Sequence, residues 1–282
     1  MRKSYRLALP GGGALEMGRR TLVVGVLNVT PDSFSDGGRY DQTESALEHA
    51  LRMQAEGADI IEVGGESTRP GSERLLASDE LARITPVLRA LGKRIGIPIA
   101  VDTYKSEVAR AALDLGATLI NDVSALRFDA KIADVAAQAQ AALVLMHMRG
   151  EPATMQKIAP SPDIFAEIES DLNVALREAE ARGVSREQVI LDPGIGFGKT
   201  AEQNLALLNH LECFASFDLP LMIGVSRKRF IGSLTGRGEG ERVYGTAAAV
   251  AAAILRGAHL VRVHDVREIV DVVRVTDAIR SA

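Results

Sequence analysis

Polar side chains that can bind anions and metal ions follow short apolar runs along this chain. Four of them carry a positive charge or can acquire one: Arg69, Lys228, Arg262 and His264. Asn28, near the end of the first apolar run, offers a neutral oxygen to a hard cation. Magnesium commonly binds through one or two protein oxygens together with substrate phosphates. The sequence therefore predicts a site for a phosphorylated ligand with a divalent cation.

A second group combines two carboxylates with an amide: Asp102, Asn121 and Asp192. Around a cavity, such groups can accept hydrogen bonds from a ring rich in N–H donors, such as an aminopyrimidinone. Simpler explanations exist, because Asp102 could cap the next helix and Asp192 could anchor a turn at Pro193. Their common position near the ends of apolar runs favours a binding site, since buried charges need partners.

The elements that must hold these side chains alternate between strands and helices. Helical spacing recurs in segments such as 43–58, 78–92 and 105–117, with Ser78 as a start signal and Gly92 and Gly116 as stop signals. Alternating βα units predict parallel strands, and eight of them fit a closed (β/α)8 barrel. An open doubly wound sheet is the alternative. The eight predicted strands span 22–29, 59–65, 98–103, 118–124, 142–148, 189–194, 221–226 and 260–265.

The whole chain, residues 1–282, is expected to form a single TIM-barrel domain with its catalytic core at about 20–282. No Pro/Ser-rich linker or charge block divides it. The glycines of segment 11–22 suggest a short N-terminal β-hairpin ahead of the first strand, which could plug the bottom of the barrel.

Long loops are predicted at the carboxyl ends of the strands, the face where barrel active sites lie. The connections 30–41, 66–78 and 149–162 are long and turn-rich, and His147 closes the strand before the last of them. We expect residues 30–40 to form a mobile lid, which without substrates is disordered or displaced while Asn28 stays fixed.

Composition narrows the classes of function. The chain is 46% hydrophobic and 25% charged with a formal net charge of −4, so it lacks the basic excess expected of a nucleic-acid-binding protein. It has neither an uninterrupted apolar stretch of membrane-spanning length nor a signal-peptide core, so we expect a cytoplasmic protein that does not bind a membrane. Cys213 is the only cysteine, which excludes an intramolecular disulfide, and a buried core thiol is expected.

Two apparent motifs lack residues that their functions require. The segment DPGIGFGKT looks like a nucleotide phosphate loop, but Pro193 stands where that loop needs a glycine. The other histidines, His49, His210 and His259, lie in or beside helical segments, and none has the paired spacing of a histidine-ligated zinc site, which is therefore not expected.

Eight segments resemble, in order, the signature segments of the dihydropteroate synthase family. They are GVLNVTPDSFSDGG, IIEVGGESTRPGS, VDTYKSEVA, LINDVS, MHMRGEPATMQ, LDPGIGFGK, GVSRKRFIG and RVHDV. The resemblance runs from about residue 20 to the C-terminus. Ala125 stands where the family often has glycine, and Arg229 where it often has serine.

The resemblance implies a TIM-barrel transferase of folate biosynthesis. Such an enzyme condenses 6-hydroxymethyl-7,8-dihydropterin diphosphate with p-aminobenzoate and releases pyrophosphate. It is usually a homodimer, requires Mg²⁺, and is the target of sulfonamides. Departure of pyrophosphate would leave a stabilised cation on the pterin, which the arylamine then attacks.

Site residues carried over from the family fall into five groups. The catalytic group would be Arg69, Asp102, Lys228, Arg262 and His264. Pterin contacts would come from Asp102, Asn121, Met146, Asp192, Phe197 and Lys228. Asn28 would bind Mg²⁺, and the diphosphate would meet Thr68, Arg69, Arg262 and His264. The p-aminobenzoate would be surrounded by Phe34, Pro70, Ser226 and Lys228. Asp36 would lie in the same lid as Phe34.

Two other functions are compatible with a pterin-binding barrel. A methyltetrahydrofolate-dependent methyltransferase would share the carboxylate and amide contacts, but it would have little use for a diphosphate cluster or for the Thr68-Arg69-Pro70 segment. A non-catalytic pterin-binding paralogue would be expected to have lost Asn28, Arg69, Lys228 or His264, and all four are present.

Overall fold

Eight parallel strands form the centre of the molecule in a computed structural model that describes residues 2–30, 39–69 and 71–282. They are β3 (Leu22–Asn28), β4 (Ile60–Gly64), β5 (Ile99–Asp102), β6 (Leu119–Asp122), β7 (Ala142–Met146), β8 (Val189–Asp192), β9 (Met222–Gly224) and β10 (Leu260–Val263). Each lies within its predicted range.

The sheet curls into a nearly closed barrel. Its strand order is β8-β7-β6-β5-β4-β3-β10-β9, with each neighbouring pair parallel. A parallel bridge between Leu191 and Leu221, with Leu191 N–H donating to the Pro220 carbonyl over 3.0 Å, links β8 to the start of β9. The predicted TIM-barrel fold is confirmed, and the open sheet is not formed.

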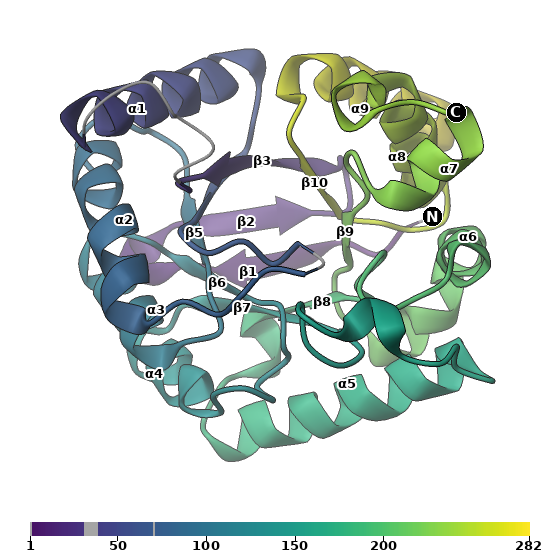
Figure 1. The fold of residues 1–282 in the computed structure, drawn as a ribbon, viewed down its shortest axis with the longest axis horizontal. Coiled ribbons are helices and arrows are strands. Elements are labelled where there is room, and N and C mark those ends of the chain that lie inside the picture. The colour runs from purple at the N-terminus through teal and green to yellow at the C-terminus, as the bar shows by residue number, and fades with distance from the viewer. Residues whose placement is uncertain (1, 31–38, 70) are drawn as a thin grey trace.

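Helices surround the strands, as Figure 1 shows, and pack on their outward apolar side chains. The outer core joins strand residues such as Ile61 and Val101 to helix residues such as Ile84, Leu88 and Val108, all with negligible exposure. The helices are α1 (Arg39–Glu56), α2 (Ala77–Leu91), α3 (Ser106–Asp114), α4 (Lys131–Ala139), α5 (Ile164–Ala181), α6 (Ala201–Asn209), α7 (Arg229–Thr235), α8 (Val243–Leu255) and α9 (Val266–Ser281).

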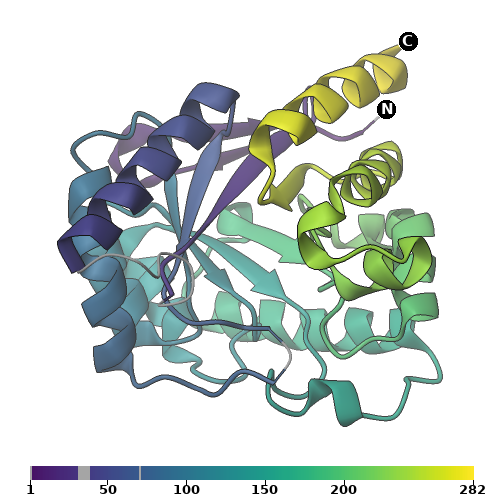
Figure 2. The same ribbon diagram turned by 45° about the horizontal axis from the view of Figure 1, so that its top comes forward.

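The N-terminal hairpin closes one end of the barrel. Its strands β1 (Tyr5–Ala8) and β2 (Ala14–Met17) pair antiparallel, so the hairpin begins before the predicted segment 11–22. Leu7 and Met17 pack on barrel-interior residues such as Leu22 and Leu260, which lie at the amino ends of their strands. The hairpin is the pair of purple strands near the N-terminus in Figure 2. Because it covers this apolar layer, the opposite end, at the carboxyl ends of the strands, is left for the polar residues.

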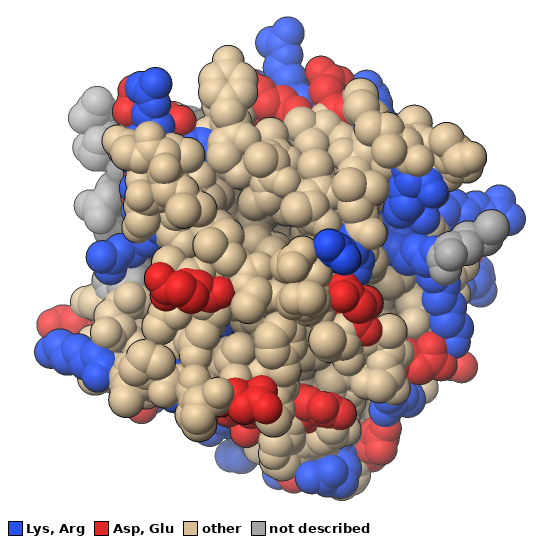
Figure 3. Space-filling model, turned by 90° about the vertical axis from the view of Figure 1, so that its right-hand side faces the viewer, with Lys and Arg blue, Asp and Glu red and all other residues tan. Residues whose placement is uncertain are grey.

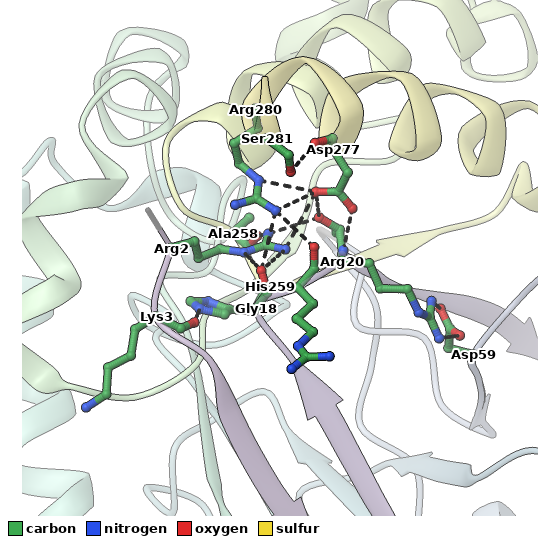
Figure 4. Close-up of polar contacts among 12 residues, drawn as sticks. Arg2, Lys3, Gly18, Arg20, Asp59, Ala258, His259, Asp277, Arg280 and Ser281 are labelled. Carbon is green, nitrogen blue, oxygen red and sulfur yellow. Dashed lines mark hydrogen bonds and ion pairs between the residues drawn. The ribbon is translucent and has the colours of Figure 1, made fainter.

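The two chain ends meet beside this hairpin. Arg2 donates to Thr21 Oγ1 over 2.9 Å and forms an ion pair with Asp277 of α9 at 3.6 Å. Asp277 also accepts from the Thr21 backbone N–H over 2.5 Å and from Arg280 Nε over 3.3 Å. Figure 4 shows the side chains of Arg2, Asp277 and Arg280 converging between the N-terminal segment and α9. The first and last elements are therefore joined at the bottom of the barrel.

Two local expectations are wrong. α2 begins at Ala77 with Leu76 in the cap position and no side-chain cap, so Ser78 lies inside the helix rather than at its start. Cys213 is exposed, because it lies on a 3-10 helix (Leu211–Phe217) that directs Leu211, Phe214 and Phe217 inward and leaves the cysteine outside. No helix of the described ranges has both the length and the apolar character needed to cross a membrane.

Candidate active site at the carboxyl ends of the strands

Strand register brings several predicted site residues side by side. Asn28 pairs with Gly64 between β3 and β4, Gly64 pairs with Asp102 of β5, and Asp102 pairs with Asn121 of β6. A Cβ added at Gly64 would lie 3.7 Å from Asn28 Oδ1 and 3.5 Å from Asp102 Cβ. The missing side chain of Gly64 therefore leaves room in which Asn28 and Asp102 face the same space.

A buried ionic network underlies this row of residues. Arg262 of β10 donates from Nη2 to Asp102 Oδ2 over 2.8 Å and from Nε to Glu62 Oε1. The second Glu62 oxygen accepts from Asn121 Nδ2 over 3.0 Å. Glu62 is 1% exposed, so it holds Arg262 and Asn121 in place from within the barrel. Sequence reasoning missed Glu62, although a charged residue in the middle of the predicted strand 59–65 was a usable signal.

Two acceptor atoms in this network have no hydrogen-bond partner within the described part of the chain. They are Asp102 Oδ1 and Asn121 Oδ1, and both are fully buried. A buried polar atom without a partner costs roughly 1–3 kcal/mol. A ligand that presents N–H donors to this pair of atoms would remove that cost.

Asp192, Lys228 and Phe197 form a second part of the site. Asp192 ends β8 opposite Met146 of β7, and its Oδ1 accepts from the Gly194 backbone N–H over 2.7 Å. The Lys228 ammonium lies 3.9 Å from the centre of the Phe197 ring. Met146 and Phe197 belong to one buried apolar cluster. A flat ring could thus contact an apolar surface while its polar edge meets charged groups.

Burial moves the pKa values of Asp102, Asp192 and Lys228 towards neutral pH. It raises the pKa of Asp102 to about 7, against the opposing effect of Arg262, and that of Asp192 to about 6. It lowers the pKa of Lys228 to about 7, with Arg262 acting in the same direction. Perturbed titratable groups gathered in one place are typical of functional sites.

His264 and Ser226 lie together at the ends of β10 and β9. The Ser226 hydroxyl is 3.0 Å from His264 Nδ1 and accepts from the His264 backbone N–H over 3.2 Å. Burial, followed by Arg262 and Arg227, lowers the pKa of His264 to about 3. The imidazole is therefore neutral at physiological pH and can donate one hydrogen bond to an anion.

The loop after β4 carries Thr68 and Arg69, but it does not bring Arg69 into the buried network. Thr68 is half-buried, whereas the Arg69 side chain is 66% exposed and forms an ion pair with Glu239 Oε1 at 2.8 Å. Phe34, Asp36 and Pro70 lie outside the described residues, as does most of the predicted lid 30–40.

Two other polar residues near the strand ends serve the fold. His147 is buried, and its Nε2 lies 3.3 Å from Asp171 of α5, so its ring turns towards the surrounding helices. Asp122 accepts from the backbone N–H groups of Ser124 and Leu126 over 2.8 and 2.6 Å, which fixes the turn after β6.

Comparison with known proteins agrees with this geometry. The model of the pterin binding enzyme family matches residues 24–264. A dihydropteroate synthase from Synechocystis is 46% identical over 273 residues, 96% of this chain and 94% of that protein. The chain therefore has the sequence expected of a pterin-binding enzyme over almost its whole length.

Solved structures give the same result. Dihydropteroate synthase from Clostridium difficile, determined with pteroic acid, has a TM-score of 0.89 at 42% identity and covers 94% of this chain and 98% of its own. The enzyme from Xanthomonas albilineans with 4-aminobenzoic acid has a TM-score of 0.91 at 42% identity, covering 99% and 100%. The barrel, its polar rim and these similarities together show that the chain is a transferase of the dihydropteroate synthase family of pterin-binding enzymes.

Proposed function

We propose that the protein condenses 6-hydroxymethyl-7,8-dihydropterin diphosphate with p-aminobenzoate to give 7,8-dihydropteroate and pyrophosphate. The observation that carries this proposal is a pair of buried acceptors beside Arg262, Asp102 Oδ1 and Asn121 Oδ1, which have no partner among the described residues. The pterin ring supplies the matching N–H donors, with Asp192 as a third acceptor and Met146 and Phe197 beside the ring. The ligands of the two related structures, pteroic acid and 4-aminobenzoic acid, support the same substrate class.

In the proposed reaction the bond between the pterin methylene carbon and the diphosphate oxygen breaks first. Pyrophosphate leaves with the bonding electrons, and Asp102 and Asp192 favour the positive charge that remains on the pterin. Arg262, neutral His264 and Arg69 stabilise the leaving group through hydrogen bonds, which are strongest when the acceptor is charged. The p-aminobenzoate nitrogen then forms a bond to the methylene carbon with its lone pair and releases one of its protons to solvent.

Arg69 would have to move for this role, because Glu239 holds it at the surface. Exposed ion pairs of this kind contribute only about 0–1 kcal/mol, so a diphosphate can compete with Glu239 for the arginine. Thr68, which precedes Arg69 in the loop, would then contact the same diphosphate. Ser226 and Lys228, with Phe34 and Pro70, would surround the p-aminobenzoate.

Mg²⁺ is the proposed cofactor, and the donor set suits it. Asn28 offers a hard amide oxygen next to Asp102, and the diphosphate would supply further oxygens. Bound there, Mg²⁺ would supply neutralisation of leaving-group charge. The side chain of Asn28 would orient the diphosphate end of the substrate towards Arg262 and His264.

The direct test incubates the purified protein with the pterin diphosphate, labelled p-aminobenzoate and Mg²⁺. Formation of labelled dihydropteroate, lost on chelation and restored by added Mg²⁺, is the expected result. If no labelled product forms while a known synthase in a parallel reaction makes it, the proposed reaction is wrong.

We also propose that the protein acts as a homodimer through the side formed by α7 and α8. Leu234, Tyr244 and Leu255 on these helices are 63%, 86% and 52% exposed. Figure 3 looks onto this side, where uncharged residues form much of the surface. Light scattering after gel filtration should give twice the monomer mass for the wild-type protein. The Tyr244→Glu variant should give a lower mass, closer to that of a monomer. A monomeric wild-type protein at micromolar concentration would rule out this assembly.

A further inference from the structure

Lys199 is a buried cation that the reaction proposed above does not use. It belongs to the segment DPGIGFGKT, which fails as a nucleotide phosphate loop. Only 8% of the residue is exposed. Its ammonium group donates to three backbone carbonyls: Gly194 at 2.8 Å, Phe197 at 3.2 Å and His147 at 3.3 Å. The number of acceptors equals the number of donors on an ammonium group.

These three carbonyls join two separate parts of the rim. Gly194 and Phe197 belong to the loop that follows β8, whereas His147 lies just after β7. The loop approaches β7 so closely that a Cβ at Gly194 would lie 1.8 Å from the His147 carbonyl oxygen. Gly194 has φ of +69°, which a glycine adopts without strain. Lys199 therefore bridges the junction between the loop and the end of β7.

The bridged loop carries two groups of the proposed pterin site. Asp192 precedes the loop and accepts from the Gly194 N–H, and Phe197 lies within it, stacked under the Lys228 ammonium. Because Lys199 binds the carbonyls of Gly194 and Phe197, its contacts fix the backbone of Phe197 directly. They fix Asp192 through Gly194, whose N–H the Asp192 carboxylate accepts.

We propose that Lys199 is a positioning residue, whose ammonium group holds the loop 193–198 against β7 and thereby sets Asp192 and Phe197 for the pterin ring. This inference rests on the proposed function and adds a residue that does not itself touch substrate. Removal of Lys199 should weaken pterin binding more than it slows the chemical step.

The charge of Lys199 has a second effect, on Asp192. Lys228, Lys199 and Arg262 all act to lower the pKa of Asp192, against its burial. On Lys199 itself, burial lowers the pKa, and of the charges near it Asp192 and Glu167 raise the pKa while Lys228 and Arg149 lower it. Loss of the Lys199 charge should therefore raise the pKa of Asp192. Loosening of the loop alone would not produce this effect.

The experiment compares Lys199→Met, Lys199→Arg and the exposed control Lys131→Met with the wild-type enzyme. We expect Lys199→Met to raise KM for the pterin diphosphate about tenfold, the loss associated with a charged hydrogen-bonding group, with much smaller changes in kcat and in KM for p-aminobenzoate. The fall in pterin binding at low pH, the acid limb of its pH profile, should move to higher pH in Lys199→Met. Lys199→Arg should keep the wild-type acid limb but show a raised KM, because a planar guanidinium does not match three acceptors around one nitrogen.

The results distinguish failure of the proposed function from failure of the positioning role. A wild-type enzyme that makes no dihydropteroate contradicts the proposed function, not the role of Lys199. A Lys199→Met enzyme with wild-type KM and acid limb, or one in which both substrates and thermal stability are affected alike, overturns the positioning role. If Lys199→Met does not fold, the Lys199→Arg enzyme decides: a wild-type KM overturns the proposal, and a raised KM with an unmoved acid limb supports it.

Discussion

Arg262 donates from Nη2 to Asp102 Oδ2 over 2.8 Å, so the arginine proposed for the diphosphate is in direct contact with an acid proposed for the pterin ring. The contact occupies one Asp102 oxygen and leaves Oδ1 buried without a partner among the described residues. Binding at one end of the substrate is therefore coupled to binding at the other, because both depend on the same ion pair.

Asp102→Asn keeps the shape of the side chain but replaces its charge and one acceptor by an amide. We expect pterin affinity to fall about 10- to 100-fold, the range for a hydrogen bond to a charged group. Titration with a pterin that lacks the diphosphate measures this directly. Asp114→Asn, an exposed change on α3, is the matched control and should bind as the wild type does. Equal affinities for Asp102→Asn and its control would remove Asp102 from the site.

Glu62→Gln tests the support beneath the site. In glutamine one of the two oxygens becomes an NH2 group, which would face a donor of either Arg262 or Asn121. The change also leaves Arg262 with less compensating charge. Breaking a buried ion pair costs about 3–5 kcal/mol when one partner is removed, so both thermal stability and pterin affinity should decrease. Calorimetry and ligand titration provide the two measurements, with the exposed Glu48→Gln as control. Unchanged melting temperature and affinity would show that Glu62 holds nothing essential.

Arg69→Ala should separate the two ends of the substrate. The side chain is exposed, so stability should hardly change, whereas kcat/KM for the pterin diphosphate should fall about 10- to 100-fold through loss of a charge-assisted contact. Binding of a pterin without the diphosphate should be unaffected, as should all properties of Arg89→Ala. An equal loss with both ligands would contradict the assignment of Arg69 to the diphosphate.

The pH dependence of pterin binding follows from the buried carboxylates. Each carboxylate already uses one oxygen within the protein, Asp102 Oδ2 for Arg262 and Asp192 Oδ1 for Gly194, so a proton would occupy the oxygen left for the ligand. Burial raises the pKa of Asp102 to about 7 and that of Asp192 to about 6. Affinity should therefore decline as the pH falls through about 7 to 6, well above the range in which exposed carboxylates titrate. Asp192→Asn should remove the lower part of this decline. A pH-independent affinity between 8 and 5 would exclude both residues as acceptors.

Much of the architecture follows from a repeated local pattern. Eight apolar runs with polar ends predict the strands, and because parallel strands end on one face, Asp102, Asn121 and Asp192 could be grouped before their positions were known. Glu62 escaped this reasoning because its role depends on Arg262 and Asn121, which come from other strands. The pairing of Arg69 with Glu239 likewise joins two distant loops, and no periodicity records such a contact.

Local sequence signals also gave wrong predictions where the packing of neighbouring residues determines the structure. Ser78 is a favourable cap residue, yet α2 starts one residue earlier with no side-chain cap. Cys213 is apolar enough for a core, yet the spacing of Leu211, Phe214 and Phe217 already fills the inward face of its helix. In both cases the burial of neighbouring residues, rather than the residue itself, determines the outcome.

The meeting of Arg2, Thr21 and Asp277 at the bottom of the barrel places the first and last residues of the fold side by side. A short peptide could connect them, and the chain could then be opened in a surface loop between two other strands, as proteins with adjacent ends often allow. Such a circular permutant would keep the same rim residues in a different chain order. The polar rim would then depend on which strands are neighbours in space, and not on their order along the chain.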